Sequence, residues 1–417
     1  MANVSSSNGL EKRPKLRFPG FDEPWQSTLL SSVFTKNTKK NTDGQITNVI
    51  CNSAKQGLIP QREYFDKDIA NSDNTSGYYI IEENDFVYNP RKSADAPYGP
   101  ISRYKYAEAG IVSPLYLCFR AKKEINPSFF EWYFRSSAWH RYVYMSGDSG
   151  ARHDRVSIKD DTFFAMPINL PSAHEQEHIA SFLERIDQRI EKQRALVESL
   201  KKYKRGLLRA YFVTDNWKSQ GTWSKCKLGA CCSKIGSGKT PKGGSSVYAN
   251  QGIMFLRSQN VLWGTLDISE VSFIDEATNS TMQSSEVRFG DVLLNITGAS
   301  IGRSCIYTSN DRANVNQHVC IIRLSQESKE RLLPEFLLQQ ILSDRIQQQV
   351  MDCQNGGSRE GLNFQQIADF NIVIPEMEEQ RKICGMLKAF DQKLCNEEIS
   401  LKALFSLRTS LMQQLFI

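Results

Sequence analysis

Apolar residues recur at alternating steps of four and three along two stretches of the chain, 172–215 and 376–417. This alternation is the 3.5-residue period of a coiled-coil seam, so each stretch is predicted to form a helix of about 40 residues and about 60 Å. Ser172, with Glu175 three residues later, predicts a capping box at the start of the first helix. The predicted seam residues are Ile179, Leu183, Ile186, Ile190, Val197 and Leu200 in the first stretch and Ile383, Leu387, Phe390, Leu394, Leu401 and Leu404 in the second.

The two helical stretches are copies of each other. Pro171 precedes the first and Pro375 the second, which sets an offset of 204 residues (375 − 171), and a Glu-Gln pair follows each proline at the same distance. Two matched helices in one chain are expected to pair with each other, although two separate helical arms on two domains would also fit. Polar residues interrupt both seams at the same offset, at Gln193 and Lys204 and at Glu397 and Arg408.

A segment of mixed pattern precedes each helix, and the two segments share one order of elements. Each opens with Trp-x4-Leu, at Trp25 and Trp223, and continues with Asp-Phe/Val-x-x-Asn, at Asp85 and Asp291. An apolar run, a proline-led helix, a loop with glycine, serine and arginine, and a final apolar run follow in both. Similar scaffolds with different loops, held at a fixed separation, would suit a protein that recognises two different short sequences, here called words. The predicted division is a tail at 1–20, domains at 21–171 and 216–375, and helices at 172–215 and 376–417.

Composition is that of an ordinary soluble protein. The 417 residues are 40% hydrophobic and 24% charged, with a net charge of +6 that is compatible with a polyanionic partner. Ten cysteines without any Cys-x-x-Cys pair predict reduced thiols in a cytoplasmic protein. The polar start of the chain predicts no signal peptide, and no apolar run approaches the 18 residues of a membrane span.

Three short motifs resemble catalytic or cofactor sites. His174 and His178 fit the His-Glu-x-x-His pattern of zinc peptidases, but the copy at 378–382 has no histidine and no third ligand is signalled. Gly236–Thr240 resembles the end of a P-loop, but Ser233 stands where the first glycine is needed. That turn could contact a phosphate backbone or be a surface loop. Pro127 resembles a methyltransferase motif only faintly and fits the first residue of a helix better. No cofactor is therefore expected in this chain.

Polar side chains suited to DNA gather in the loops of both segments. Arginine reads guanine and asparagine or glutamine reads adenine in the major groove, while lysine and backbone amides fix register on phosphate. For any single residue a solvated loop is the competing interpretation, but as sets we favour DNA contact. The candidates are Arg91, Lys92, Ser102, Arg103, Lys105, Arg152 and Arg155 in the first segment and Lys239, Thr240, Arg257, Ser258, Gln259, Asn260, Thr297, Arg303, Asn316, Gln317, His318, Ser358 and Arg359 in the second.

These motifs together resemble the specificity subunit of type I restriction-modification enzymes, over about residues 16–417. The resemblance is carried by the paired Glu-Gln helices, the Trp-x4-Leu openings, GDVLLNITGASIGR at 290–303 and NVNQHV at 314–319. It implies an α+β fold with two globular target-recognition domains, each with a mixed or antiparallel sheet and helices, separated by two long antiparallel coiled-coil helices. Each domain would read one half of a bipartite double-stranded DNA site. The first segment departs from the pattern, because its counterpart of the TGASIG loop begins at Pro90.

The resemblance also implies that the chain is not catalytic by itself. It would recruit two modification subunits, which bind S-adenosylmethionine and methylate adenine, and restriction subunits that use ATP and Mg²⁺ to translocate and cut DNA. No membrane partner is expected. The alternatives are a coiled-coil assembly scaffold that does not read DNA, a zinc-dependent hydrolase, and a DNA-reading subunit of another multi-part restriction system.

Overall fold

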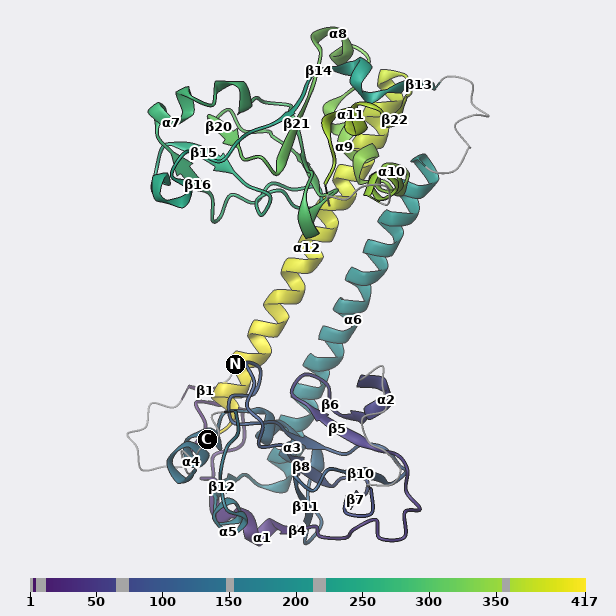
Figure 1. The fold of residues 1–417 in the computed structure, drawn as a ribbon. Helices are drawn as coiled ribbons and strands as arrows, with labels where there is room; N and C mark the ends of the chain where they lie inside the picture. Colours follow the sequence, from purple (N-terminus) through teal and green to yellow (C-terminus); the bar gives the residue numbers. More distant parts are fainter. Residues whose placement is uncertain (1–2, 5–12, 65–74, 148–153, 213–222, 355–360) are drawn as a thin grey trace. The chain divides into compact units, whose positions relative to one another are not determined.

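The computed structural model describes residues 3–4, 13–64, 75–147, 154–212, 223–354 and 361–417 (Figure 1). The chain divides into two compact units. The first unit combines Met1–Arg194 with Ser400–Ile417, and the second is the continuous stretch Ala195–Ile399. None of the helices within the described ranges combines the length and apolar character needed to cross a membrane.

Two long helices are present where the apolar pattern predicts them. Helix α6 (Ala173–Phe212) has 40 residues and helix α12 (Met377–Leu415) has 39. The two lie side by side in each unit, teal and yellow in Figure 1. All twelve predicted seam residues are buried or half-buried, and so are the four polar residues that interrupt the seams.

The two helices run antiparallel within each unit. In the first unit Asp187 binds Arg408 at 2.5 Å, and Arg194 lies over the ring of Phe405. Residue numbers thus rise along α6 while those of its partners fall along α12. The second unit shows the same direction, because its contacts are Lys201 with Glu398, Lys204 with Asp391 and Tyr211 with Met386.

The start of α6 differs from the prediction in one detail. The Oγ of Ser172 accepts from the backbone N–H of Glu175 at 3.2 Å, as a cap should. The carboxylate of Glu175 does not return to Ser172. It accepts instead from Nε and Nη2 of Arg17, both at 2.8 Å, and is 1% exposed. Arg17 comes from the predicted tail, so residues 16–17 are part of the folded first unit.

The first unit is built on small antiparallel sheets. A four-stranded sheet has the order β4-β11-β8-β9, and four further pairs are β1-β2, β10-β7, β5-β6 and β12-β3. Its strands are β1 (Asn3–Val4), β2 (Leu16–Arg17), β3 (Gln26–Leu29), β4 (Phe34–Lys36), β5 (Ile50–Ser53), β6 (Gly57–Pro60), β7 (Tyr79–Ile81), β8 (Phe86–Tyr88), β9 (Ile101–Arg103), β10 (Gly110–Val112), β11 (Leu117–Ala121) and β12 (Pro167–Leu170). Its shorter helices are α1 (Leu30–Val33), α2 (Gln61–Tyr64), α3 (Pro127–Arg135), α4 (His140–Ser146) and α5 (Asp160–Phe164).

Aromatic rings fill the core of the first unit. Phe34 meets Phe86, Phe119 and Phe130 edge to face, with ring centroids 5.0–5.4 Å apart. Such contacts add to the free energy gained by burying the rings. The residue that follows α12 completes this core, because Phe416 packs on Phe129 and is 5% exposed.

The second unit repeats this plan with a larger sheet system. One four-stranded antiparallel sheet has the order β14-β21-β18-β19, and a mixed sheet has the order β16-β15-β20-β17, in which β15 and β20 are parallel. Its strands are β13 (Ser224–Lys227), β14 (Cys232–Ser237), β15 (Ile253–Leu256), β16 (Ser272–Ile274), β17 (Glu286–Val287), β18 (Val292–Asn295), β19 (Ser304–Ile306), β20 (Ala313–Val315), β21 (Val319–Leu324) and β22 (Asn371–Ile374). Its shorter helices are α7 (Glu276–Ser280), α8 (Gln326–Lys329), α9 (Pro334–Leu342), α10 (Asp344–Gln354) and α11 (Phe364–Ala368).

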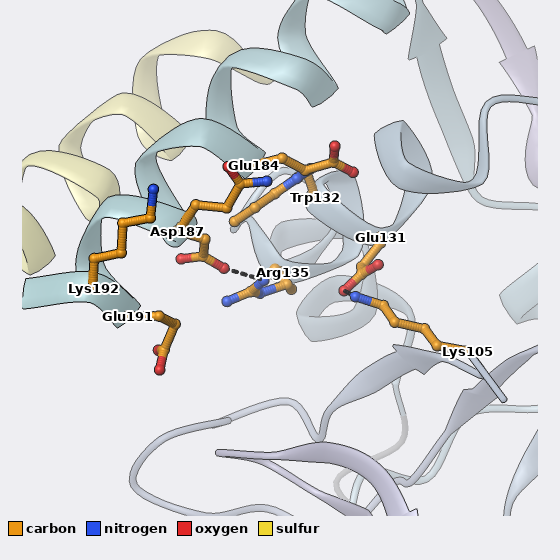
Figure 2. A pocket seen from close by; sticks show the side chains of 9 residues that line it. Lys105, Glu131, Trp132, Arg135, Glu184, Asp187, Glu191 and Lys192 are labelled. Carbon is orange, nitrogen blue, oxygen red and sulfur yellow. Dashed lines mark hydrogen bonds and ion pairs between the residues drawn. The ribbon is translucent and has the colours of Figure 1, made fainter. Parts of the chain in front are cut away.

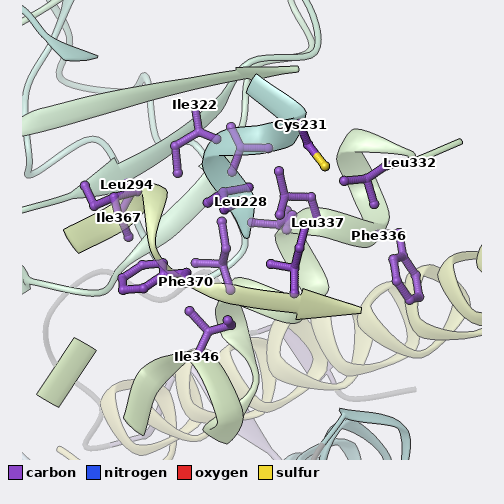
Figure 3. Close-up of a cluster of buried hydrophobic side chains, with 14 of the residues drawn as sticks. Leu228, Cys231, Leu294, Ile322, Leu332, Phe336, Leu337, Ile346, Ile367 and Phe370 are labelled. Carbon is purple, nitrogen blue, oxygen red and sulfur yellow. The ribbon is translucent and has the colours of Figure 1, made fainter. Parts of the chain in front are cut away.

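Aliphatic side chains dominate the core of the second unit. Helices α9, α10 and α11 supply Leu337, Ile346 and Ile367, which pack with Leu228 and Ile322 (Figure 3). Each of these five side chains is fully buried. Both units therefore confirm an α+β fold of two sheet-and-helix domains joined by paired helices.

Candidate nucleic-acid interface

Four loops of the second unit meet at one edge of its sheets. Strands β14, β15 and β18 end at this edge and β21 begins there. Backbone hydrogen bonds join the loops: Gly238 N–H donates to Asn316 O, Asn316 N–H to Leu256 O, and Ile296 N–H to His318 O, at 3.0–3.2 Å. The polar segments singled out in the sequence are thus brought together as one rigid surface.

Gly238 explains the glycine-rich sequence at 236–240. A Cβ built on Gly238 would lie 1.7 Å from the carbonyl oxygen of Val315, so only glycine allows this approach. Strand β14 ends at Ser237, and residues 238–243 do not form the helix that a P-loop requires. The turn positions Lys239, which is exposed, at the edge of the sheets.

A row of four hydrogen-bonded side chains crosses this edge. Thr240 Oγ1 donates to Gln317 Oε1, and Gln317 Nε2 lies 3.0 Å from His318 Nε2. Because an amide nitrogen only donates, His318 Nε2 accepts and the ring proton is on Nδ1. That Nδ1–H donates to Thr297 Oγ1 at 2.6 Å. The row therefore fixes both the amide of Gln317 and the tautomer of His318.

Three cations at this edge have no anionic partner among the described residues. Lys239 is exposed, Arg257 and Arg303 are half-buried, and no ion pair of theirs is present. The guanidinium of Arg257 lies 5.5 Å from the ring centre of Tyr248, and its Nε is buried without a hydrogen-bond partner. Unpaired guanidinium groups beside fixed amides are suited to phosphate and guanine.

The structure corrects the prediction for two asparagines of the second unit. Asn260 is 3% exposed, with Oδ1 accepting from Arg257 N–H and Nδ2 donating to Asp267 O, both at 2.9 Å. Asn316 is 7% exposed, and its Oδ1 accepts from His318 N–H at 3.1 Å. Both side chains are buried and hold turns, and Asn260 uses its amide oxygen and its amide nitrogen in doing so. Ser258 is half-buried beside Asn260, and Gln259 is exposed.

The equivalent edge of the first unit holds a pocket of about 860 Å³. Its walls are the turn between β5 and β6, the loop that follows β8, and the turn that precedes β11. The predicted residues Arg91, Lys92 and Arg155 all line it. Lys55 and Leu115 lie in the same walls and were not predicted, although the hairpin between two short apolar runs could have indicated Lys55.

Charge in this pocket is positive. Four cations line it against one carboxylate, that of Asp95, which lies 3.5 Å from Lys55 Nζ. Burial raises the pKa of the Cys51 thiol and of the Tyr116 phenol above their ordinary values, so both lining groups remain neutral. The pocket therefore favours an anionic or polar ligand.

Three other predicted residues of the first unit are committed to internal contacts. Arg103 donates from Nε to Asn84 Oδ1 at 2.8 Å and from Nη1 to Ser128 Oγ at 3.1 Å. Ser102 donates to Asn52 Oδ1 at 2.7 Å, and Lys105 Nζ lies 2.7 Å from Glu131. Strand β9 meets the loop edge at Ile101, so Arg103 and Lys105 follow toward the opposite edge. The prediction of DNA contact is corrected for Arg103 and Lys105, and the Ser102 hydroxyl is used inside the domain.

Lys105 faces a different pocket, of about 530 Å³, between α3 and α6 (Figure 2). There Arg135 binds Asp187 at 3.1 Å and its guanidinium stacks 4.2 Å from the centre of the Trp132 ring. Glu131 is paired with Lys105. The contact of Arg135 with Asp187 attaches α3 to α6, so this pocket is structural.

The remaining predictions concern residues outside the described ranges and a possible zinc site. Arg152, Ser358 and Arg359 lie outside the described residues. His174 and His178 lie in the first turns of α6, where His178 Nδ1 is 2.9 Å from the carbonyl oxygen of His174. The described ranges contain no group of three or more potential metal ligands, so the zinc interpretation gains no support.

Two stretches of the chain, residues 23–201 and 221–403, match the family described as type I restriction modification DNA specificity domain. A curated relative, the type I restriction enzyme MjaVIII specificity subunit of Methanocaldococcus jannaschii, is 23% identical over 244 residues. That match covers 55% of this chain and spans 56% of the relative's length.

Solved structures share the fold at low sequence identity. A chain from a structure of complex assembly and conformational transition in the type I R-M system is 16% identical, with a TM-score of 0.64, and the match covers 95% of this chain and 98% of that one. The S subunit of a type I restriction-modification system from M. genitalium is 15% identical, with a TM-score of 0.55 and coverage of 97% and 99%. The HsdS subunit of Thermoanaerobacter tengcongensis is 18% identical, with a TM-score of 0.50 and coverage of 96% and 97%.

Proposed function

Because the chain belongs to the family of type I restriction modification DNA specificity domains, we propose that it reads a bipartite double-stranded DNA site with the loop edges of its two units. The second unit would read one half-site with Lys239, Arg257, Arg303 and Gln317. The first would read the other with the walls of the pocket that contains Arg91 and Arg155. The observation that carries this proposal is the excess of positive over negative side chains at the same edge of both repeated sheets, where four cations line the first-unit pocket against one carboxylate.

The paired helices would set the gap between the half-sites. A helix of 40 residues is about 60 Å long, which corresponds to between one and two duplex turns of about 34 Å. The chain would act without catalytic groups of its own. Two modification subunits would supply S-adenosylmethionine-dependent methylation of adenine, and restriction subunits would supply ATP- and Mg²⁺-dependent translocation and cutting.

Arginine substitutions in one unit test whether each unit reads its own half-site. Arg257→Ala and Arg303→Ala, each in complex with the modification subunits, should relax or weaken recognition of one half-site only. Long-read mapping of methylated adenines in a host that carries the complex would report both words. Arg288→Ala is the matched control, because Arg288 is exposed just before the opposite end of β18. Equal losses on all sequences would contradict base reading, and an assembly that binds no duplex would favour the scaffold alternative.

A further inference from the structure

The two units have the same turn before the central strand of the sheet. In the first unit the turn is Ser113–Tyr116, before β11, and in the second it is Asn316–Val319, before and into β21. The first turn is closed by a hydrogen bond from Tyr116 N–H to Ser113 O at 3.0 Å, and the second by one from Val319 N–H to Asn316 O at 3.4 Å.

The residue that caps each turn also has the same role. Ser113 Oγ accepts from Leu115 N–H at 3.3 Å, as Asn316 Oδ1 accepts from His318 N–H at 3.1 Å. The two turns are thus equivalent in backbone and cap but carry different side chains at the apex. The first unit presents Pro114-Leu115 where the second presents Gln317-His318.

The second turn presents an amide in one fixed orientation. Thr240 uses one lone pair of Gln317 Oε1, and His318 uses one hydrogen of Gln317 Nε2. One acceptor and one donor remain on an exposed side chain. Adenine is the base whose major-groove edge offers an adjacent donor, N6–H, and acceptor, N7. A phosphate offers acceptors only and would be repelled by Oε1.

The first turn presents an apolar side chain instead of an amide. Leu115 is 61% exposed, and it lines the pocket that also contains Arg91, Lys92 and Arg155. An apolar side chain at the edge of a cationic pocket suits a ligand that is anionic overall but has a small apolar group. In the major groove that group is the methyl of thymine.

We propose that these equivalent turns are specificity-determining elements, with Gln317 reading an adenine of the second half-site and Leu115 contacting a thymine methyl of the first. This inference rests on the proposed DNA-reading function and goes beyond it, because it assigns one base to one residue in each unit. Thr240, His318 and Thr297 are then positioning residues, which act through the orientation of the Gln317 amide.

The first test exchanges the chemistry of the turns in the complex with the modification subunits. Gln317→Leu should change one position of the second word and leave the first word intact, and Leu115→Gln should do the reverse. In Gln317→Leu, discrimination at the affected base pair should fall by about 5- to 150-fold, as loss of a good bidentate contact does. The readouts are long-read methylation mapping and fluorescence anisotropy on duplexes that differ at that base pair.

The second test separates positioning from folding. Thr240→Val removes the hydroxyl at similar volume and should relax the same position of the second word as Gln317→Leu, whereas Thr240→Ser should restore the wild-type word. Gln326→Leu is the matched control, because Gln326 is an exposed glutamine just beyond the opposite end of β21. Within each variant the word of the unmodified unit reports whether the complex is intact.

The possible outcomes separate the two proposals. If the wild-type complex marks no bipartite site, the proposed function fails. If it marks one and Gln317→Leu and Leu115→Gln leave both words unchanged, or weaken binding equally on every duplex as a phosphate contact would, the assignment of the turns is overturned.

Discussion

At the scale of single residues, the repeated Asp-x-x-x-Asn motif serves two purposes in each unit. Asp291 accepts from Arg323 at 2.8 and 2.6 Å, and Asp85 accepts from Arg120 at 2.6 and 2.7 Å. At the other end of the strand, Asn295 Nδ2 donates to the carbonyl oxygen of Ser258 at 2.8 Å. The aspartate fixes the central strand, and the asparagine fixes a loop at the edge that we propose contacts DNA.

Loss of one partner from the more buried pair should be costly. The side chains of Asp291 and Arg323 are 2% and 14% exposed, so Asp291→Ala should lower the free energy of unfolding by about 3–5 kcal/mol. Asp85→Ala should cost less, because Arg120 is 41% exposed and also contacts Glu82 at 2.9 Å. Urea unfolding followed by tryptophan fluorescence measures both.

A double variant controls for the buried charge. Asp291→Leu combined with Arg323→Met should recover most of the loss, because an apolar pair of similar volume leaves no uncompensated ion. If the double variant loses as much stability as Asp291→Ala, the loss does not come from an uncompensated buried charge. The interaction between Asp291 and Arg323 would then itself stabilise the fold.

His140 predicts a pH dependence of the first unit. Burial beside the rings of Tyr98 and Trp139 lowers the pKa of His140 below its ordinary value of 6.5. The unfolded chain then binds the proton more readily than the folded one, so stability is present above pH 6.5 and is lost as the pH falls below it. The melting temperature between pH 7.5 and 5 should show this loss, and His140→Asn should reduce it. An unchanged slope in the variant would exclude His140 as its source.

Residue patterns predicted where polar groups lie but not what each one binds. The sequence placed Gln317, Arg303 and Lys239 in polar loops suited to DNA contact, and the structure brings these loops to one edge. The sequence could not show that the Asn260 side chain closes its own turn and is not available to a ligand. That depends on a hydrogen bond to the carbonyl oxygen of Asp267, seven residues away. Nor could it show that Arg103 binds Asn84, which lies on another segment with φ of 70°.

At the scale of elements, the paired helices have the same ion pair at two equivalent positions. Lys204 of α6 binds Asp391 of α12 in the second unit, and Asp187 of α6 binds Arg408 of α12 in the first. The two pairs correspond at the repeat offset of 204 residues (391 − 187 and 408 − 204). Polar residues in the seam therefore form charge pairs that specify an antiparallel register.

A charge exchange tests that register. Asp391→Lys alone would oppose Lys204 with a like charge and should lower stability by about 1 kcal/mol, since both side chains are partly exposed. Lys204→Asp combined with Asp391→Lys should restore the wild-type melting temperature. A double variant as unstable as the single one would contradict direct pairing of these two residues.

Among the elements, the helices were the most predictable. A 3.5-residue period sustained over some 40 residues has no competing interpretation as a strand, and both helices begin and end within the predicted stretches. Strands such as β9, β10 and β20 have three residues each, which is too short for an alternating pattern to emerge. Their pairing depends on partners distant in sequence.

At the scale of the whole molecule, the proposed spacer predicts how the recognised gap responds to length. One heptad inserted into α6 near residue 198, with a second in α12 near residue 399, preserves the seam, because Lys201 and Glu398 face each other at 2.9 Å. Seven residues add about 10 Å of helix, so the gap should grow by about three base pairs. Methylation mapping would measure it, and an unchanged gap would contradict the spacer.

The division into units has a consequence for biosynthesis. The second unit is one uninterrupted stretch, whereas the aromatic core of the first is completed only by Leu415 and Phe416, against Phe129 and Tyr133. A ribosome synthesises Leu415 and Phe416 after every residue of the second unit. The first unit, although most of it is translated first, therefore completes its core last. A chain that stops before Leu415 would have every residue of the second unit but an exposed aromatic core in the first.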